Sequence, residues 1–287
     1  MLAYTTRGKN GDITSLSVYM GELTIPAEDT QNNQEITLNG TSLENMYIIC
    51  FNDEGKVKWA NTSEYLELDE LIYMGYIGNN FVMQYVPANQ TVTIPSDKTE
   101  SGEEMVLEMN DNAIAVMLIY NEEGKVSNAV KINAPNIDYS AVSYSIAKDG
   151  GMIISAYSET PLIFDSTETV TGEEIQAQGG ILIKYNQEGK VEWAKSISGT
   201  AAIGAEKEVS NGYIGIMEYM GEIKVAPEDT ASGEEITLTS QSVSEASTAM
   251  VKYNSQGQVE WLIDINYSIN NDLMSMMIQE TENGYSK

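Results

Sequence analysis

Short runs in which apolar and polar residues alternate cover most of the chain. In residues 181–185, two isoleucines and a tyrosine occupy one face, while a leucine and a lysine occupy the other. A period of two is the pattern of a β-strand, whose successive side chains point to opposite faces. No segment has a convincing period of 3.6 residues, so we expect no long helix. The pattern predicts an all-β protein.

An aromatic-Asn-x-x-Gly turn followed by x-Val ends these runs at four places, residues 51–57, 120–126, 185–191 and 253–259. Glycine accepts the positive φ of a tight turn, so each turn predicts a β-hairpin. We expect the hairpin cores near residues 46–60, 114–129, 180–195 and 248–262. All three tryptophans, Trp59, Trp193 and Trp261, fall four residues after such a glycine, and Asn128 takes that place in the second segment.

A second block recurs with the same spacing. The sequence Tyr-Met-Gly-Glu at 19–22 returns at 219–222, and Glu-Ile-Thr-Leu at 35–38 returns at 235–238. Two further strand-like runs precede each hairpin, and between the second and third strands we expect a polar excursion with its own short β-pair. The chain is therefore interpreted as four segments of about 67 residues, each with four antiparallel strands.

Tandem four-stranded antiparallel units most often close radially into a β-propeller, and a linear β-stack is the alternative. Residues 1–10 match the end of a first strand, and residues 272–279 carry another first strand after the fourth hairpin. In a closed ring, this last strand would join the blade that the N-terminal residues begin; in a piece of a longer array, the overlap would be an arbitrary cut. We predict that residues 1–287 form a single all-β domain, a β-propeller of about four four-stranded blades.

Composition narrows the range of functions. The chain has 43 acidic and 15 basic residues and a formal net charge of −28, which disfavours nucleic acid and anionic membrane surfaces as partners. It has no histidine and one cysteine, which excludes intrachain disulfides, zinc sites built from His and Cys, and His-dependent catalytic triads. No run approaches the roughly 18 apolar residues of a membrane span, and residues 1–9 lack the apolar part of a signal peptide. We expect neither a nucleic-acid partner nor membrane insertion.

Residues 180–195 resemble the core of SBBP-type bacterial β-propeller repeats, and more closely the tandem repeats of cell-surface proteins from Gram-positive anaerobes. Their sequence, Gly-Ile-Leu-Ile-Lys-Tyr-Asn-Gln-Glu-Gly-Lys-Val-Glu-Trp-Ala-Lys, is similar to the family's I-x-K-Y-N/D-x-x-G-x-x-x-W-A. The second segment departs from it at Ile119 and Asn128, and the first has Cys50 where later segments have lysine. The resemblance implies a propeller in an extracellular or cell-surface context. It transfers no catalytic residue, because that family has no single activity.

The recurring residues have both structural and functional interpretations. The tryptophans could stack on sugars, but their fixed place beside a strand valine favours the core. The Asn-x-x-Gly turns lack the alternating oxygen ligands of a calcium loop, which favours ordinary turn chemistry. Cys50 is interpreted as a small hydrophobic residue, because no cation is indicated that would activate a thiol.

Carboxylates supply the remaining candidate sites. Acidic tips at residues 28–30, 97–99, 165–168 and 228–230 place acids and hydroxyls at matching points of the segments. Such oxygens suit a calcium ion, although solvated turns explain them equally well, and we expect no cofactor. Four further acids, Asp69, Glu70, Glu206 and Glu208, lie on or beside predicted first strands, which line the channel of a propeller. They are the candidate ligand-binding residues, since clustered carboxylates hold a cation or raise one another's pKa.

The sequence leaves three functions open: a binding module, an enzyme and a spacer that binds no ligand. The first is a non-catalytic extracellular or cell-surface binding or adhesion module with a glycan or protein ligand, for which no catalytic residue is predicted. The alternative is a carbohydrate-active enzyme with two carboxylates, a mechanism that needs neither His nor Cys. The third is a passive spacer in a longer surface protein.

Overall fold

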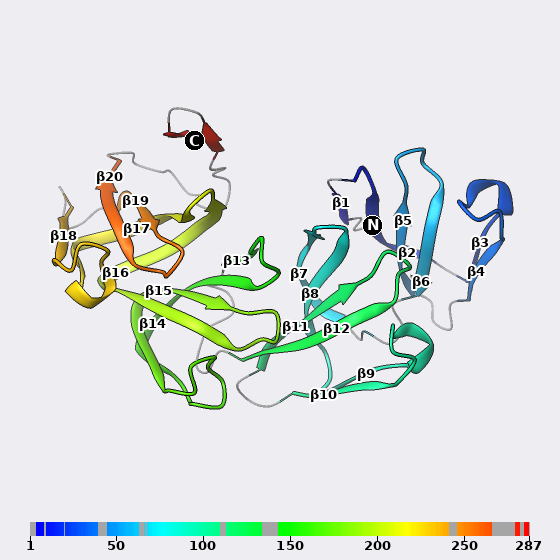
Figure 1. The fold of residues 1–287 in the computed structure, drawn as a ribbon, viewed down its shortest axis with the longest axis horizontal. Coiled ribbons are helices and arrows are strands. Elements are labelled where there is room, and N and C mark those ends of the chain that lie inside the picture. Colours follow the sequence, from blue (N-terminus) through cyan, green and yellow to red (C-terminus); the bar gives the residue numbers. More distant parts are fainter. Residues whose placement is uncertain are drawn as a thin grey trace. The chain divides into compact units, whose positions relative to one another are not determined.

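A computed structural model describes residues 4–8, 10–19, 21–39, 45–62, 66, 68–109, 113–133, 143–240, 246–265, 279–281 and 284–286 (Figure 1). These residues form antiparallel strands and short 3₁₀ turns, and no α-helix is present among them. The prediction of an all-β protein is confirmed. The chain divides into two compact units, Met1–Ile132 and Asn133–Lys287.

The first compact unit contains two four-stranded antiparallel sheets. The first sheet has the order β1-β2-β5-β6, formed by β1 (Tyr4–Arg7), β2 (Ile13–Tyr19), β5 (Asn45–Phe51) and β6 (Val57–Thr62). The second has the order β7-β8-β11-β12, formed by β7 (Leu68–Ile77), β8 (Asn80–Pro87), β11 (Ala113–Tyr120) and β12 (Val126–Asn133). In both sheets the order in space follows the order in sequence, as predicted for a segment with four consecutive strands.

The second compact unit holds the third and fourth segments in one larger sheet. Its path is β13-β14-β15-β16-β17-β19-β20, built from β13 (Ser143–Ile146), β14 (Met152–Phe164), β15 (Ile175–Tyr185), β16 (Val191–Val209), β17 (Gly212–Val225), β19 (Ser247–Tyr253) and β20 (Val259–Asp264). The N-terminal half of β16 pairs with β15 and its C-terminal half pairs with β17. One strand therefore ends the third segment and begins the fourth.

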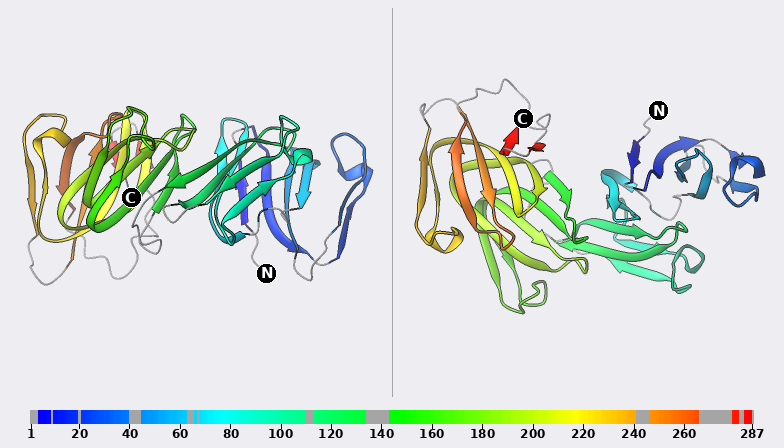
Figure 2. Two further views of the ribbon diagram at one scale, coloured as in Figure 1. Left: turned by 90° about the horizontal axis from the view of Figure 1, so that it is seen from below. Right: turned by 45° about the horizontal axis from the view of Figure 1, so that its top comes forward.

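The predicted excursions between the second and third strands are present. In the first compact unit, β3 (Glu22–Ile25) pairs with β4 (Ile36–Asn39), and β9 (Thr91–Ile94) pairs with β10 (Met105–Glu108). Figure 2 shows β3 and β4 as a hairpin beside the first sheet. In the fourth segment, the end of β17 pairs with β18 (Ile236–Thr239). The third segment differs, because β14 and β15 run through the core sheet and the excursion without a break.

Closure into a ring stays a prediction. No sheet among the described residues closes on itself. Residues 272–278 of the predicted closing strand lie outside the described residues, and Gln279 begins β21 (Gln279–Thr281), which pairs with β22 (Gly284–Ser286). The single-domain prediction for residues 1–287 likewise stays a prediction.

Tryptophan packing joins consecutive segments within each compact unit. The Trp59 side chain is 7% exposed, and its ring stacks on Tyr120 of the second segment with centroids 6.0 Å apart. The same ring lies against Gly124, where a Cβ atom would come within 2.5 Å of it. Trp193 lies against Gly257 in the same way, with 2.6 Å to an added Cβ. The predicted core role is confirmed for Trp59, while Trp193 and Trp261 are partly buried against apolar neighbours.

Replacing Gly124 by alanine should destabilise the protein more than the same change at Gly55. Both glycines have a positive φ, 77° and 80°, so alanine costs backbone strain at each position. Only at Gly124 does the new Cβ also displace the Trp59 ring, since nothing lies within 4 Å of a Cβ at Gly55. We expect an additional loss of about 1–3 kcal/mol at Gly124, measured by chemical denaturation. Equal losses for the two variants would contradict the packing of Trp59 on the turn.

Candidate functional site

The asparagine of each hairpin turn is occupied by its own backbone. The Asn52 Oδ1 atom accepts hydrogen bonds from the N–H groups of Glu54 (3.1 Å) and Lys56 (2.8 Å). The other three turns repeat the arrangement through Asn121, Asn186 and Asn254. This is the usual role of an Asx side chain in a turn, and it leaves these amide oxygens engaged in shaping the hairpins.

A buried threonine anchors each excursion. The four residues, at most 3% exposed, are Thr30, Thr99, Thr169 and Thr230. The Thr230 hydroxyl lies 3.0 Å from the Pro227 carbonyl oxygen and 2.8 Å from that of Glu234. Each threonine also forms a parallel bridge to the valine that begins the fourth strand of its own segment. These hydroxyls hold the excursion against the sheet, so they are not ligands at an exposed acidic tip.

Sequence reasoning missed the motif that builds these anchors. The pattern Thr-x-Ser/Thr-Gly-Glu-Glu occurs at 99–104, 169–174 and 230–235, and the first segment has Thr-Gln-Asn-Asn-Gln-Glu at 30–35. The glycines have φ near 72°, and Asn33, which stands in for glycine, has φ 55°. The predicted third tip, 165–168, stopped one residue before its anchor, Thr169. The recurring Gly-Glu-Glu was the available signal.

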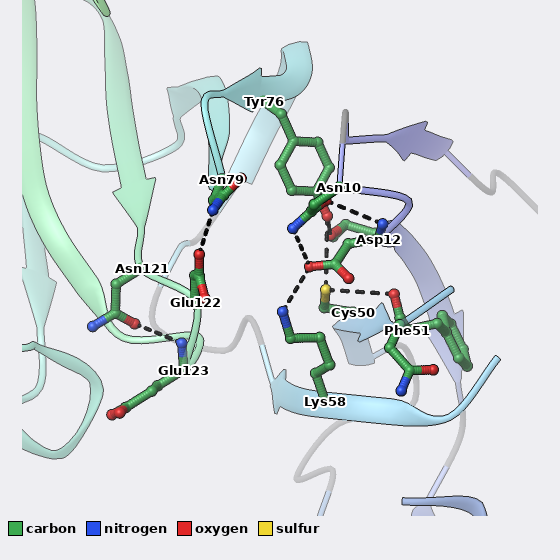
Figure 3. A network of polar contacts seen from close by, with 12 residues as sticks. Asn10, Asp12, Cys50, Phe51, Lys58, Tyr76, Asn79, Asn121, Glu122 and Glu123 are labelled. Carbon is green, nitrogen blue, oxygen red and sulfur yellow. Dashed lines mark hydrogen bonds and ion pairs between the residues drawn. The ribbon is translucent and has the colours of Figure 1, made fainter. Parts of the chain in front are cut away.

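Cys50 lies in a polar network of the first compact unit (Figure 3). Its Sγ atom is 3.7 Å from the hydroxyl of Tyr76, which in turn contacts Thr14. Burial raises the pKa of the Cys50 thiol, and the hydrogen bonds of Thr14 and Tyr76 oppose this rise only in part. A thiol with a raised pKa is a poor nucleophile. The expectation of an unreactive Cys50 therefore agrees with its surroundings, but for another reason: Lys58 does act to lower the pKa of the thiol, and burial outweighs it.

The same network contains an ion pair between Asp12, which directly precedes β2, and Lys58 on β6. The Asp12 carboxylate accepts hydrogen bonds from Lys58 Nζ (2.7 Å) and Asn10 Nδ2 (2.8 Å). Burial favours a lower pKa for Lys58, but the hydrogen bond and charge of Asp12 outweigh it and leave that pKa raised. Both charges are thus compensated inside the segment.

The third and fourth segments place a buried lysine where the first has Cys50. Lys184 Nζ donates to the Tyr185 carbonyl (3.0 Å) and to Asp149 (2.9 Å), and Lys252 Nζ donates to the carbonyl groups of Tyr253 and Asn211. A Cβ at Gly151, which matches the position of Asp12, would lie 2.2 Å from Lys184 Nζ. Glycine therefore leaves room for the ammonium group.

The first segment lacks the buried lysine, because Cys50 takes its place, but another lysine lies nearby. Lys58 stands at the position where the later segments have Glu192 and Glu260, which lie 3.6 Å and 3.4 Å from the buried lysines. The first segment thus has a base where the later segments have an acid, and its own acid, Asp12, stands where the third segment has Gly151. The charged groups of these networks are paired with one another, whereas the amide of the fully buried Gln84 on β8 has no hydrogen-bond partner among the described residues.

The four predicted channel acids lie on first strands, as expected. Asp69 and Glu70 are on β7 of the first compact unit, and Glu206 and Glu208 are on β16 of the second. Asp69 is exposed, and Glu208 accepts a hydrogen bond from the backbone N–H of Lys148 and forms a 3.8 Å ion pair with its Nζ. The side chains of Glu70 and Glu206 lie outside the described residues. Convergence of these acids on one channel stays a prediction.

Within the described part of the chain, no three Asp, Glu or Cys side chains are grouped so as to hold a metal ion. No helix in that same part is long and apolar enough to cross a membrane. The acidic tips therefore supply carboxylates without an assembled set of ligands among the described residues.

Open hollows occur on the surface of the described residues, and sequence reasoning identified neither of the two that follow. The first, the glutamate hollow, has a volume of about 390 Å³ and belongs to the first compact unit; its lining comprises Asn80, Thr99, Glu100, Asn121, Glu122, Glu123 and Lys125. The second, the Tyr157 hollow, has a volume of about 360 Å³ and belongs to the second; its lining comprises Tyr157, Ser158, Glu159, Gln178, Gly179, Ser198 and Gly199. Both volumes fall at the low end of the range for small-molecule sites.

The two hollows differ in charge. Three glutamates and a lysine line the glutamate hollow, and amide groups already bind two of its carboxylates: Asn121 Nδ2 lies 3.1 Å from Glu100, and Asn79 Nδ2 lies 2.7 Å from Glu122 (Figure 3). The Tyr157 hollow has a single charged side chain, Glu159, among its lining residues. A neutral ligand suits the Tyr157 hollow better.

Comparison with protein-family models finds none that matches the chain, and comparison with curated proteins finds no match either. The resemblance to bacterial propeller repeats therefore stays a prediction.

Stability should fall between about pH 10 and pH 12, partly through Tyr219. Burial, followed by the hydrogen bond and charge of Asp264, raises the pKa of Tyr219 from 10.0 to about 12. The folded state thus keeps a proton that the unfolded state loses above its ordinary pKa, and stability is lost as the pH rises toward the folded value. Tyr219→Phe should lose less stability than the wild type over this range in denaturation experiments. Parallel losses would show that Tyr219 ionises normally.

Proposed function

We propose that the chain is a non-catalytic binding module displayed outside a bacterial cell, with its four segments arranged as blades of a β-propeller. The observation that carries the binding role is the Tyr157 hollow, in whose lining Glu159, Gln178 and Ser198 are exposed and belong neither to the hairpin turns nor to the threonine anchors. The recurring polar residues, by contrast, shape turns and excursions. The hollow therefore favours a binding role over that of a passive spacer, which needs no ligand site.

The chemistry of the hollow supports binding rather than turnover. Hydrolysis of a glycosidic bond needs two carboxylates flanking the bond, with an acid and a base or nucleophile in separate places. The Tyr157 hollow has one carboxylate in its lining, and no thiol or histidine that could replace the second. The glutamate hollow has three glutamates in its lining, enough for a two-carboxylate mechanism. These three residues are the observation that favours the enzyme alternative.

Two features support the propeller arrangement. Each segment contains four antiparallel strands in sequence order, and a tryptophan packs on the next segment's turn within each compact unit. Radial arrays of such sheets leave only short edges exposed. The extracellular setting rests on the resemblance of residues 180–195 to surface-protein repeats.

Incubating the protein with a glycan array and with a panel of soluble proteins tests binding, and a hydrolysis assay on every bound glycan tests turnover. We expect binding without product formation. We also expect the affinity to be constant between about pH 6 and pH 8, because the chain has no histidine. Release of a product would show that the chain is an enzyme, and binding to neither panel would favour the spacer.

The predicted channel acids are tested by changing Asp69, Glu70, Glu206 and Glu208 together to their amides. If these acids hold the ligand or a cation, the change should abolish binding or release the ion, measured by calorimetry and by elemental analysis. Unchanged binding would remove the channel as a site and leave the surface hollows.

Ring closure is tested by Ser275→Pro, with Ser275→Ala as the control. Proline cannot donate to a strand ladder, so it should lower the unfolding midpoint if residues 272–279 pair within the first blade. A midpoint equal to that of the alanine variant would contradict closure by this strand.

A further inference from the structure

The Tyr157 hollow lies where the third segment differs from the others. In the first, second and fourth segments, extra residues separate the excursion from the third strand: 40–44, 109–112 and 240–246. In the third segment, β15 continues from the excursion into the core sheet without any such insertion, and β14 does the same on the outgoing side, with a register shift between Ser158 and Leu162 (Figure 1). The hollow therefore lies where the third segment passes into the fourth along β16, and it depends on this local departure from the shared plan.

Two of the residues that line the hollow are glycines, Gly179 and Gly199, so no side chain covers the main chain there. Gly179 has φ 85°, and a Cβ atom there would lie 2.5 Å from the carbonyl oxygen of Ile197. Gly199 has φ 102°, and its Cβ would lie 2.5 Å from the carbonyl oxygen of Glu222. Neither position can accept another residue without strain, since L-residues avoid this conformation and the atoms met are backbone. A ligand can thus approach the main chain between the side chains of three neighbouring strands.

Polar side chains surround these glycines on three strands. Gln178 on β15 and Ser198 on β16 are exposed, and Glu159 on β14 is exposed beside them. The Gln178 Nε2 group donates to the Glu159 carbonyl oxygen over 2.7 Å, and the Ser198 hydroxyl donates to the Lys224 carbonyl oxygen over 3.1 Å. These two bonds orient the amide and hydroxyl groups before a ligand arrives. Tyr157, which is partly buried, adds one aromatic ring.

This set of groups excludes several ligand classes. No lysine or arginine lines the hollow, and the chain carries a net charge of −28, so an anion is disfavoured. One carboxylate is too few for a calcium ion, which takes six to eight oxygen ligands. Tyr157 is the one large apolar side chain in the lining, so a hydrophobic ligand would find little surface to bury. A small neutral molecule with many hydroxyl groups fits best, because an amide, a carboxylate and a hydroxyl can each exchange hydrogen bonds with it.

We infer that the Tyr157 hollow binds one neutral sugar ring of a glycan, with Tyr157 against the ring and Glu159, Gln178 and Ser198 bonded to its hydroxyl groups. The inference rests on the proposed binding function and names its ligand class. Because the hollow is open to solvent, the affinity for a single sugar is weak, on the order of millimolar.

The experiment titrates the full chain with neutral monosaccharides and short neutral glycans, observed by ligand-detected NMR. The double variant Glu159→Ala/Gln178→Ala should bind at least about tenfold more weakly than the wild type, since two hydrogen-bonding groups are lost. The matched control is Glu174→Ala/Gln176→Ala, which removes the same two residue types from exposed positions on or beside β15, where Gln176 bonds to Glu174. The control should bind as the wild type does.

Hydrogen exchange on the wild type keeps the test independent of the variants' folding. A bound sugar should slow exchange at residues 157–159, 178–180 and 197–199, and nowhere near the glutamate hollow. Wild-type affinity in the Glu159/Gln178 variant, or protection confined to other residues, would overturn the inference while leaving the proposed binding function intact. Binding of a protein but of no sugar would do the same. Hydrolysis of the bound glycan would overturn the proposed function itself.

Discussion

The contact between a tryptophan ring and the glycine of the following turn is the interaction on which the arrangement of these sheets depends. A four-stranded sheet with two apolar faces cannot remain alone in water, so each face needs a partner. Trp59 fills the space beneath Gly124, and Trp193 does so beneath Gly257, because a turn without a side chain lets a large ring approach the backbone. The glycine thus serves two purposes: it allows the positive φ of the turn and it receives the neighbouring segment.

Charged groups inside the segments follow a second constraint, which is that a buried charge must be compensated locally. The third and fourth segments meet it with a buried lysine that reaches backbone carbonyl groups and a nearby carboxylate. The first meets it with Lys58 on the neighbouring strand and Asp12 in the place of a glycine. The same backbone therefore tolerates opposite placements of charge, provided that all the partners change together. This freedom explains how the segments can diverge while keeping the same strand order.

Local signals made most of the fold predictable. Alternation, the Asn-x-x-Gly turns and the recurring Glu-Ile-Thr-Leu block each act within a few residues, and they predicted the hairpins and the excursions. The compensation around Cys50 could not be found in this way, because Asp12, Cys50 and Lys58 meet only through the register of three strands. The Tyr157 hollow was equally inaccessible: its lining combines residues of three strands, and register shifts follow Ser158 on one strand and Ser198 on another. The channel acids were chosen by strand position alone, and strand position says nothing about what a side chain faces.

The continuous strand β16 connects the two segments of the second compact unit through a shared backbone. Its two halves complete two successive segments, so hydrogen bonds to β15 and to β17 are carried by one uninterrupted backbone. Opening either segment removes a strand edge from the other, which couples their local unfolding into one cooperative event. In the first compact unit, β6 ends at Thr62 and β7 begins at Leu68, so its two sheets have no strand in common. A chain assembled from similar segments can thus differ along its length in how readily a single segment opens, according to whether its strands are shared or separate.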